Sequence, residues 1–98
     1  KIYEDDDILA FRDIHPQRPV HVLVIPKKHI VSLATVSAED TLILGKMLAK
    51  ANEIACAEGS TDGFRVIINS GRVGGQEVAH LHAHIVGGPD PVGPMLKH

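Results

Sequence analysis

Three histidines at alternate positions, His80, His82 and His84, form the pattern in this chain that most directly indicates chemistry. Side chains in a β-strand switch faces at every residue, so the three imidazoles would point the same way, roughly 7 Å apart along the strand. The residues between them are apolar and would face the other side, where they could pack against a helix. Free imidazole titrates near neutral pH, so such a row predicts a site for nucleophilic attack, proton transfer or metal binding.

Three interpretations of the histidine row are open. It could be a polar outer face that happens to use histidine. It could bind zinc, because His-x-His can place two imidazoles on one ion, with His21 or Glu77 as a third ligand. It could transfer a phosphoryl or nucleotidyl group, with one free-base ring attacking phosphorus and a cationic neighbour holding the oxyanion or protonating the leaving group.

The segment before the histidines favours phosphoryl chemistry. Gly71, Gly74 and Gly75 lie directly upstream of the row, and the backbone N–H groups of such a loop can surround an anion without interference from side chains. The chain has neither the Gly-Lys-Ser/Thr of a P-loop nor the spacing of a dinucleotide-binding fingerprint. We therefore expect an anion-binding loop that leads into a histidine strand.

The elements that must position this site are predicted to form an α+β fold: a five-stranded, mainly antiparallel sheet with one long helix on one face. The strands are expected at residues 1–4, 8–12, 20–25, 64–69 and 78–86. The helix is expected at 37–58, with Ser37 as its N-cap, Asp40 at the capping-box position and Gly59 as its terminator. Its apolar stripe is expected to consist of Leu44, Met47, Leu48, Ala51, Ile54 and Ala55.

Several other features have ordinary structural interpretations. The acidic triplet at residues 5–7 is expected to be a solvated turn and not a metal site. Cys56 lies near the apolar stripe of the helix and is expected to be an inert buried thiol. His15, His29 and His98 are expected to be surface residues.

Composition limits the class of protein. Ten Lys and Arg against twelve Asp and Glu give a net charge of −2, which excludes the strongly basic surface of a nucleic-acid-binding protein. Apolar runs are far shorter than the roughly 20 residues of a membrane span. With no signal-peptide pattern and one cysteine, the chain is expected in the cytoplasm, with no nucleic-acid or membrane partner.

The sequence resembles the histidine triad (HIT) superfamily, and within it the Hint branch of purine nucleoside phosphoramidases of bacterial type. The segment HLHAHIV at 80–86 matches the triad signature. Further matching segments are FRDIHPQ at 11–17, HVLVIPKKHI at 21–30, GGQEV at 74–78, GG at 87–88 and GPML at 93–96. The resemblance covers nearly the whole chain, which we expect to be a single HIT domain over 1–98 that lacks the N-terminal segment of the family.

The resemblance implies cleavage of the P–N bond of nucleoside 5′-phosphoramidates through a nucleotidyl-histidine intermediate. By matching position, His82 would be the nucleophile, His84 would bind the phosphate, His80 would support the site and His21 would lie behind the nucleophile in a polar relay. The nucleotide would be bound by these histidines (His82 and His84) together with Phe11, Arg12, Asp13, Ile14, Leu23, Asn69, Gly75, Gln76, Glu77 and Val78. Asp13 would accept the ribose hydroxyls, and residues 75–78 would form the phosphate loop.

The same resemblance implies a homodimer, a purine nucleoside monophosphate or phosphoramidate as ligand, and neither a cofactor nor a metal. Glu77 departs from members that carry Ser at this position, and we hypothesise that its carboxylate favours a cationic amine as leaving group. Two alternatives to the phosphoramidase remain open: a dinucleoside polyphosphate hydrolase of the Fhit type, and a nucleotide-binding regulatory protein whose hydrolysis is incidental.

Overall fold

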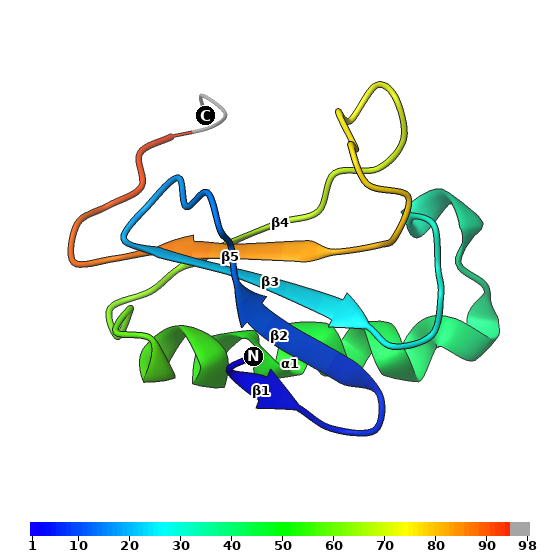
Figure 1. Ribbon diagram of the computed structural model, residues 1–98, viewed down its shortest axis with the longest axis horizontal. Coiled ribbons are helices and arrows are strands. Elements are labelled where there is room, and N and C mark those ends of the chain that lie inside the picture. Colours follow the sequence, from blue (N-terminus) through cyan, green and yellow to red (C-terminus); the bar gives the residue numbers. More distant parts are fainter. Residues whose placement is uncertain (95–98) are drawn as a thin grey trace.

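The computed structural model describes residues 1–94 of the chain. Its five strands form one antiparallel sheet in the order β1-β2-β3-β5-β4, and a long helix, α1, lies against one face of that sheet (Figure 1). The strands are β1 (Tyr3–Glu4), β2 (Ile8–Arg12), β3 (Val20–Pro26), β4 (Arg65–Ile67) and β5 (Ala83–Gly87). The predicted α+β fold class is confirmed, although β1 and β4 are shorter than predicted.

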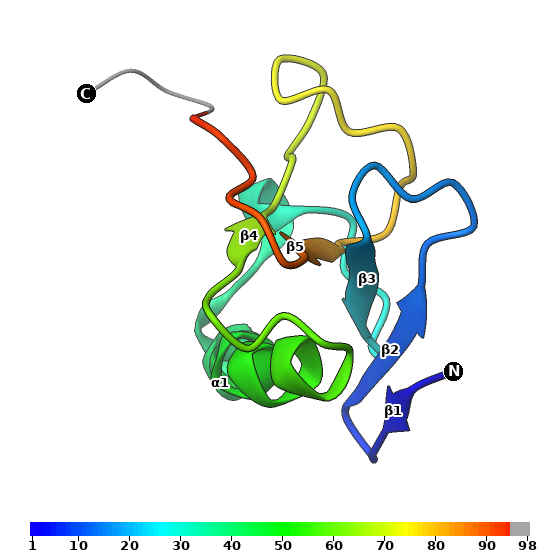
Figure 2. The ribbon, with the colours of Figure 1, turned by 90° about the vertical axis from the view of Figure 1, so that its left-hand side faces the viewer.

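The core lies between α1 and the sheet. Val22, Val24 and Ile85 of the central strands are almost fully buried, together with Met47 and Ile54 of the helix. Because side chains alternate along a strand, this packing turns the intervening residues of β3 and β5 toward the opposite face. Figure 2 shows that the loops following β2 and β4 rise on that opposite side, away from α1.

The helical region starts differently from the prediction. A 3-10 turn, Ala38–Asp40, comes first, and α1 itself covers Thr41–Ala57. Ser37 and Asp40 form the expected capping box, but they cap the 3-10 turn, and the Ser37 N–H donates to Asp40 Oδ2 (2.9 Å). The buried Asp40 carboxylate also binds Lys28 Nζ (2.6 Å), so the helix start is joined to the chain that follows β3.

The predicted end of the helix is confirmed. Gly59 has a φ of +106°, which favours glycine because it has no Cβ. The Gly59 N–H donates to Cys56 O (3.1 Å) and the Ser60 N–H donates to Ala55 O (2.9 Å). These two bonds satisfy the last helical carbonyls in a Schellman arrangement.

The apolar stripe of α1 is narrower than predicted. Met47, Ala51, Ile54 and Ala55 are buried, and Leu44 packs against the core. Leu48 was wrongly assigned to the stripe, because it is 54% exposed. Cys56 is half-buried and not buried, since it lies at the margin of the contact between helix and sheet.

The predicted strand at 78–86 is wrong in its first half, because β5 begins only at Ala83. Pairing between β3 and β5 runs from Val20 with Gly87 to Val24 with Ala83. Two residues further along β3 is Pro26, which has no N–H to continue the ladder. Residues 78–82 leave the sheet at this point, although burial still alternates from His80 to Ile85.

Two loops are each organised around one hydrogen-bonded polar side chain, half-buried Asp5 and buried Ser60. Asp5 Oδ1 accepts the N–H groups of Asp7 (2.8 Å) and Ile8 (3.0 Å), which confirms that the acidic triplet is a turn. The fully buried Ser60 hydroxyl donates to Gly63 O (2.7 Å) and accepts the Gly88 N–H (3.1 Å).

Within residues 1–94, no helix combines the length and apolar character that crossing a bilayer requires.

Candidate active site

The ring of His82 is oriented by its own backbone. Its Nδ1 lies 2.8 Å from the carbonyl oxygen of His80. A carbonyl only accepts hydrogen bonds, so Nδ1 of His82 carries the proton and donates it, and Nε2 of the neutral ring keeps a free lone pair. The half-buried His82 therefore has a nucleophilic nitrogen directed away from its own chain.

His84 follows in β5 and contacts both other rings of the site. Its ring centroid lies 5.0 Å from that of His82, and its Nδ1 lies 2.9 Å from Nε2 of His21. Burial lowers the pKa of His84, and positive charge on His82 or His21 would lower it further, while the Asp13 carboxylate acts in the opposite direction. His84 is therefore mainly neutral at pH 7.

His21 does not lie behind the predicted nucleophile. The register pairs Leu23 with His84 and His21 with Val86, so His21 is diagonal to His84 on the shared face of the sheet, while His82 lies beyond the paired region. Nδ1 of His21 accepts the N–H of Gln17 (3.0 Å), and its Nε2 lies 3.5 Å from Asp13 Oδ2. The expected polar relay therefore runs to His84.

His80 is held by contacts with the end of β3 and with the residues that follow it. Its Nε2 donates to Pro26 O (2.9 Å), and its ring packs edge-on against His29 at a centroid distance of 5.1 Å. The N–H of Leu81 donates to Ile30 O (2.7 Å). The chain after β3 thus holds the histidine segment in place where no strand pairing does.

A cavity of about 460 Å³ opens beside His82. Most of its lining is apolar, and it brings together the five residues predicted to hold base and ribose: Phe11, Arg12, Asp13, Ile14 and Leu23. The other lining residues are Ile25, Val78, His80 and His82. The guanidinium of Arg12 is directed elsewhere, because it forms a two-point ion pair with Glu58 (2.6 and 3.1 Å). Only the inner part of the Arg12 residue is left to the cavity.

The glycine-rich loop is held by the side chain of Gln76. Its Oε1 accepts the Gly71 N–H (2.9 Å), and its Nε2 donates to Val31 O (2.6 Å) and Val78 O (2.8 Å). These three bonds of the side-chain amide hold the loop in position. Any contact between Gln76 and a phosphate would therefore have to come from the backbone N–H of Gln76. Gly75 has a φ of +77°, so it makes a turn that residues with a Cβ rarely adopt.

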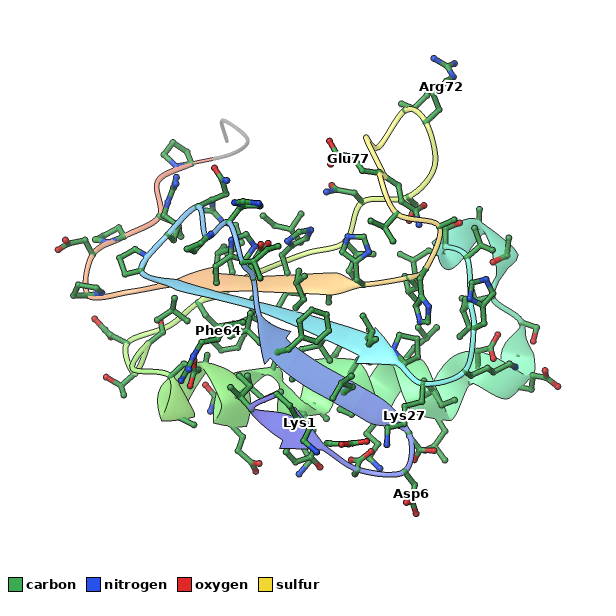
Figure 3. The ribbon with its side chains drawn as sticks, viewed as in Figure 1. Lys1, Asp6, Lys27, Phe64, Arg72 and Glu77 are labelled. Carbon is green, nitrogen blue, oxygen red and sulfur yellow. The ribbon has the colours of Figure 1, made fainter. Side chains whose placement is uncertain are left out.

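Three predicted phosphate-side residues differ in exposure. Asn69 is half-buried, whereas Glu77 and Val78 are exposed. Figure 3 shows Arg72 at the tip of the loop and Glu77 nearer its base, on the side of the sheet away from α1. The loop therefore stands over the face that carries the histidines.

A metal-binding arrangement is favoured by distance but opposed by the hydrogen bonds. Among the described residues, ligand atoms of Asp13, His21 and His84 lie within 4.8 Å of one another. This set differs from the two triad histidines with His21 or Glu77 that the zinc interpretation would use. The Gln17 N–H occupies the lone pair on His21 Nδ1, so the neutral ring carries its proton on Nε2, the atom that would have to bind the cation. The geometry favours a hydrogen-bonded chain of rings.

Several positioning groups were missed by sequence reasoning. They are the Gln17 N–H, the carbonyls of Pro26, Ile30 and Val31, and the Glu58 carboxylate. Four of them are backbone atoms, which every residue type offers, so no residue pattern could have identified them.

The chain is similar in sequence and in fold to known proteins. A model of the HIT domain matches residues 1–90. The purine nucleoside phosphoramidase of Escherichia coli K12 is 51% identical over 98 residues, covering 99% of this chain and 82% of that protein. Protein HitA of Neisseria gonorrhoeae is 53% identical over 88 residues, covering 90% and 82%. The crystal structure of a HIT family hydrolase from Legionella pneumophila matches with a TM-score of 0.86 and 47% identity, covering 91% of this chain and 80% of that one.

Proposed function

Because the chain belongs to the HIT domain family and is a hydrolase, we propose that it hydrolyses the P–N bond of purine nucleoside 5′-phosphoramidates. The named activity of the Escherichia coli relative supports this substrate class. The observation that carries the proposal is the bond from His82 Nδ1 to His80 O, which leaves Nε2 of the neutral ring as a lone pair.

The reaction would proceed in two displacements at phosphorus. Nε2 of His82 attacks the α-phosphorus, the P–N bond breaks, and the amine leaves with its electron pair and takes up a proton. Water then attacks the nucleotidyl-histidine, the new P–N bond breaks, and nucleoside monophosphate and free His82 are released. His84, 5.0 Å from His82 between ring centroids, would donate to a phosphate oxygen as charge develops there.

Substrate binding would use the cavity beside His82. Its largely apolar lining suits a purine ring, with Phe11 and Leu23 among the residues around it. Asp13 at its edge offers a carboxylate for the ribose hydroxyls, and the loop at 75–78 would contribute backbone N–H groups to the phosphate.

The leaving group would be selected outside this cavity. Glu77 is exposed at the base of the loop, and a carboxylate there would attract a cationic amine such as a lysyl group. Glu77→Gln should lower kcat/KM for a lysyl phosphoramidate and leave a neutral-amine phosphoramidate unchanged. Equal effects on both substrates would exclude this selection.

We also propose a homodimer. Leu42 and Leu48 are exposed on α1 (82% and 54%), and β4 is an edge strand of the sheet; a second copy of the chain could cover both features. Sedimentation of the wild type and of Leu48→Glu tests this, with a dimer expected only for the wild type.

The cytoplasm is the compartment that we propose. Cys56 is a free thiol, which is compatible with a reducing environment. Fractionation of cells that produce the protein would test the assignment, and recovery with secreted proteins would contradict it.

Mass spectrometry of a quenched reaction tests the proposed chemistry. Wild-type protein is mixed with adenosine 5′-monophosphoramidate, quenched in base, digested, and searched for a nucleotide adduct. We expect the adduct on His82, in the peptide that contains residues 80–84. Product formation with an adduct on another histidine would reassign the nucleophile. Product formation without an adduct at any sampled time would favour direct attack by water.

A further inference from the structure

The hydrogen bonds around His21 determine more than the position of one ring. We propose that the backbone N–H of Gln17 fixes the protonation of His21 and His84, so that His84 meets the substrate as a neutral Nε2–H donor and does not supply the proton that the leaving amine takes up. Gln17 is then a positioning residue. The part of this inference that concerns the substrate rests on the proposed function, whereas the protonation of the free protein does not.

The assignment starts from the backbone donor. The Gln17 N–H points at His21 Nδ1 (3.0 Å), and a backbone N–H can only donate, so Nδ1 of His21 must accept. A neutral His21 therefore carries its proton on Nε2. The side chain of His21 is 5% exposed, so water cannot readily replace this donor.

The next link in the chain of rings follows from the first. His21 Nε2 lies 2.9 Å from His84 Nδ1, a distance that requires one proton between the two nitrogens. Since that proton belongs to His21, Nδ1 of His84 accepts it. The remaining proton of the neutral His84 ring is then on Nε2, directed away from His21 and available to a phosphate oxygen.

Proton balance excludes this neutral His84 as the acid. If Nε2 gave its proton to the amine, both rings together would hold one proton on four nitrogens, which leaves one ring as an imidazolate. A cationic His84 would need a proton on Nδ1, which would make His21 Nε2 an acceptor and place a proton on His21 Nδ1, facing the Gln17 N–H. The amine would instead take its proton from a solvent water molecule, which becomes hydroxide. That hydroxide is then neutralised in the bulk solution.

One neighbouring group opposes this arrangement. Asp13 Oδ2 lies 3.5 Å from His21 Nε2 and would stabilise a cationic ring there. Its other oxygen accepts the N–H of His15 (2.8 Å). Within residues 1–94, the remaining titratable neighbour of His84 is His82, and both burial and positive charge on His82 disfavour a charged His84. The test therefore has to measure protonation directly.

Long-range ¹H–¹⁵N correlation spectra of the full chain at pH 7 measure which ring nitrogen carries the proton. We expect His21 and His84 each to be protonated at Nε2 only, and His82 at Nδ1 only. Gln17→Ala removes the side chain, with its bond to His15 O, but keeps the N–H and should preserve this pattern. Gln17→Pro removes the side chain and the N–H and should make His21 a mixture of forms. A cationic His21 or His84, or a proton on His21 Nδ1, in the wild type would overturn the proposal even if Gln17→Pro fails to fold.

Kinetics separate a hydrogen-bond donor from an acid. His84→Gln places an amide N–H near the position of Nε2, whereas His84→Ala removes the donor. We expect His84→Ala to lose about 100-fold or more in kcat and His84→Gln to lose about 10-fold or less. Equal losses would overturn the donor role. If no phosphoramidate is turned over, the proposed function fails, while the spectra still decide the protonation.

Discussion

The two faces of the sheet are held by different forces. On the side of α1, apolar side chains such as Val22, Ile54 and Ile85 pack against one another, and the stabilisation is spread over many contacts. On the other side, single polar atoms determine where the rings lie, as in the bonds from His82 to His80 O and from Gln17 to His21. A change of volume should therefore affect mainly stability, and the loss of one polar atom mainly chemistry.

The largest effect is expected on the polar face. His82→Ala removes the attacking nitrogen and should lower kcat/KM for adenosine 5′-monophosphoramidate by about 10⁴-fold or more. Because His82 is only half-buried, the free energy of unfolding should change by no more than about 1 kcal/mol. Calorimetric titration with adenosine monophosphate should still detect binding. Turnover near the wild-type rate would assign the attack to another group.

The matching change on the core face should have the reverse profile. Ile54 is 3% exposed on α1, and Ile54→Ala should lower the free energy of unfolding by about 2–5 kcal/mol through lost contacts and a cavity. Urea denaturation measures this loss. The kcat per folded molecule should stay within about twofold, since the site receives no side chain from α1. A large fall in kcat would show that the two faces are coupled.

A smaller effect is expected at Gln76, whose side chain is hydrogen-bonded to backbone groups of the glycine-rich loop and of Val31. Gln76→Glu keeps the acceptor for the Gly71 N–H but removes both donors to the carbonyls of Val31 and Val78. The loop should shift, and kcat/KM should fall by about 10- to 100-fold because phosphate is less well positioned. Exposed Val73→Ala, at the same loop, is the control and should behave as the wild type. A normal Gln76→Glu enzyme would show that these bonds do not hold the loop in position.

The smallest effect concerns a polar group outside the histidine face. The ion pair with Lys28, and then the Ser37 N–H, hold the pKa of Asp40 below its ordinary value. A lowered carboxyl pKa contributes stability above the unfolded value of about 3.9, and this contribution is lost as pH falls through the folded value. Asp40→Asn should therefore lower Tm at pH 7, with the difference from wild type vanishing on acidification. Glu39→Gln, which changes an exposed partner of the same lysine, should show a smaller difference at pH 7.

Much of the core face could be predicted from sequence because its rules are local. The spacing of Met47, Ala51, Ile54 and Ala55 predicted the buried side of the helix, and Gly59 predicted its end. Leu48 was the exception, since periodicity specifies a direction but not how far the sheet extends under the helix. The 3-10 turn at Ala38–Asp40 was also missed, because its capping residues are the same as those of an α-helix.

The polar face was predictable in its residues but not in its connections. Alternation placed the three histidines correctly with respect to burial, yet it predicted a strand over His80 and His82 where the chain is irregular. The reason lies in Pro26, which is distant in sequence and ends the ladder. The partners of Arg12, His21 and Gln76 were equally non-local, so they could be identified only once the chain was folded.

The exit of β5 has a consequence for how this chain can vary. A Cβ on Gly87 would collide with the Ser60 side chain, reaching within 2.9 Å of its Cβ, and the Ser60 hydroxyl is itself engaged by Gly63 and Gly88. A larger side chain at position 60 or 87 therefore requires a smaller one at the other position, so the volumes of the two side chains are matched. Among descendants of this sequence, alanine at 87 should be accompanied by glycine at 60, and an inherited change at one should act as a permissive step for the other.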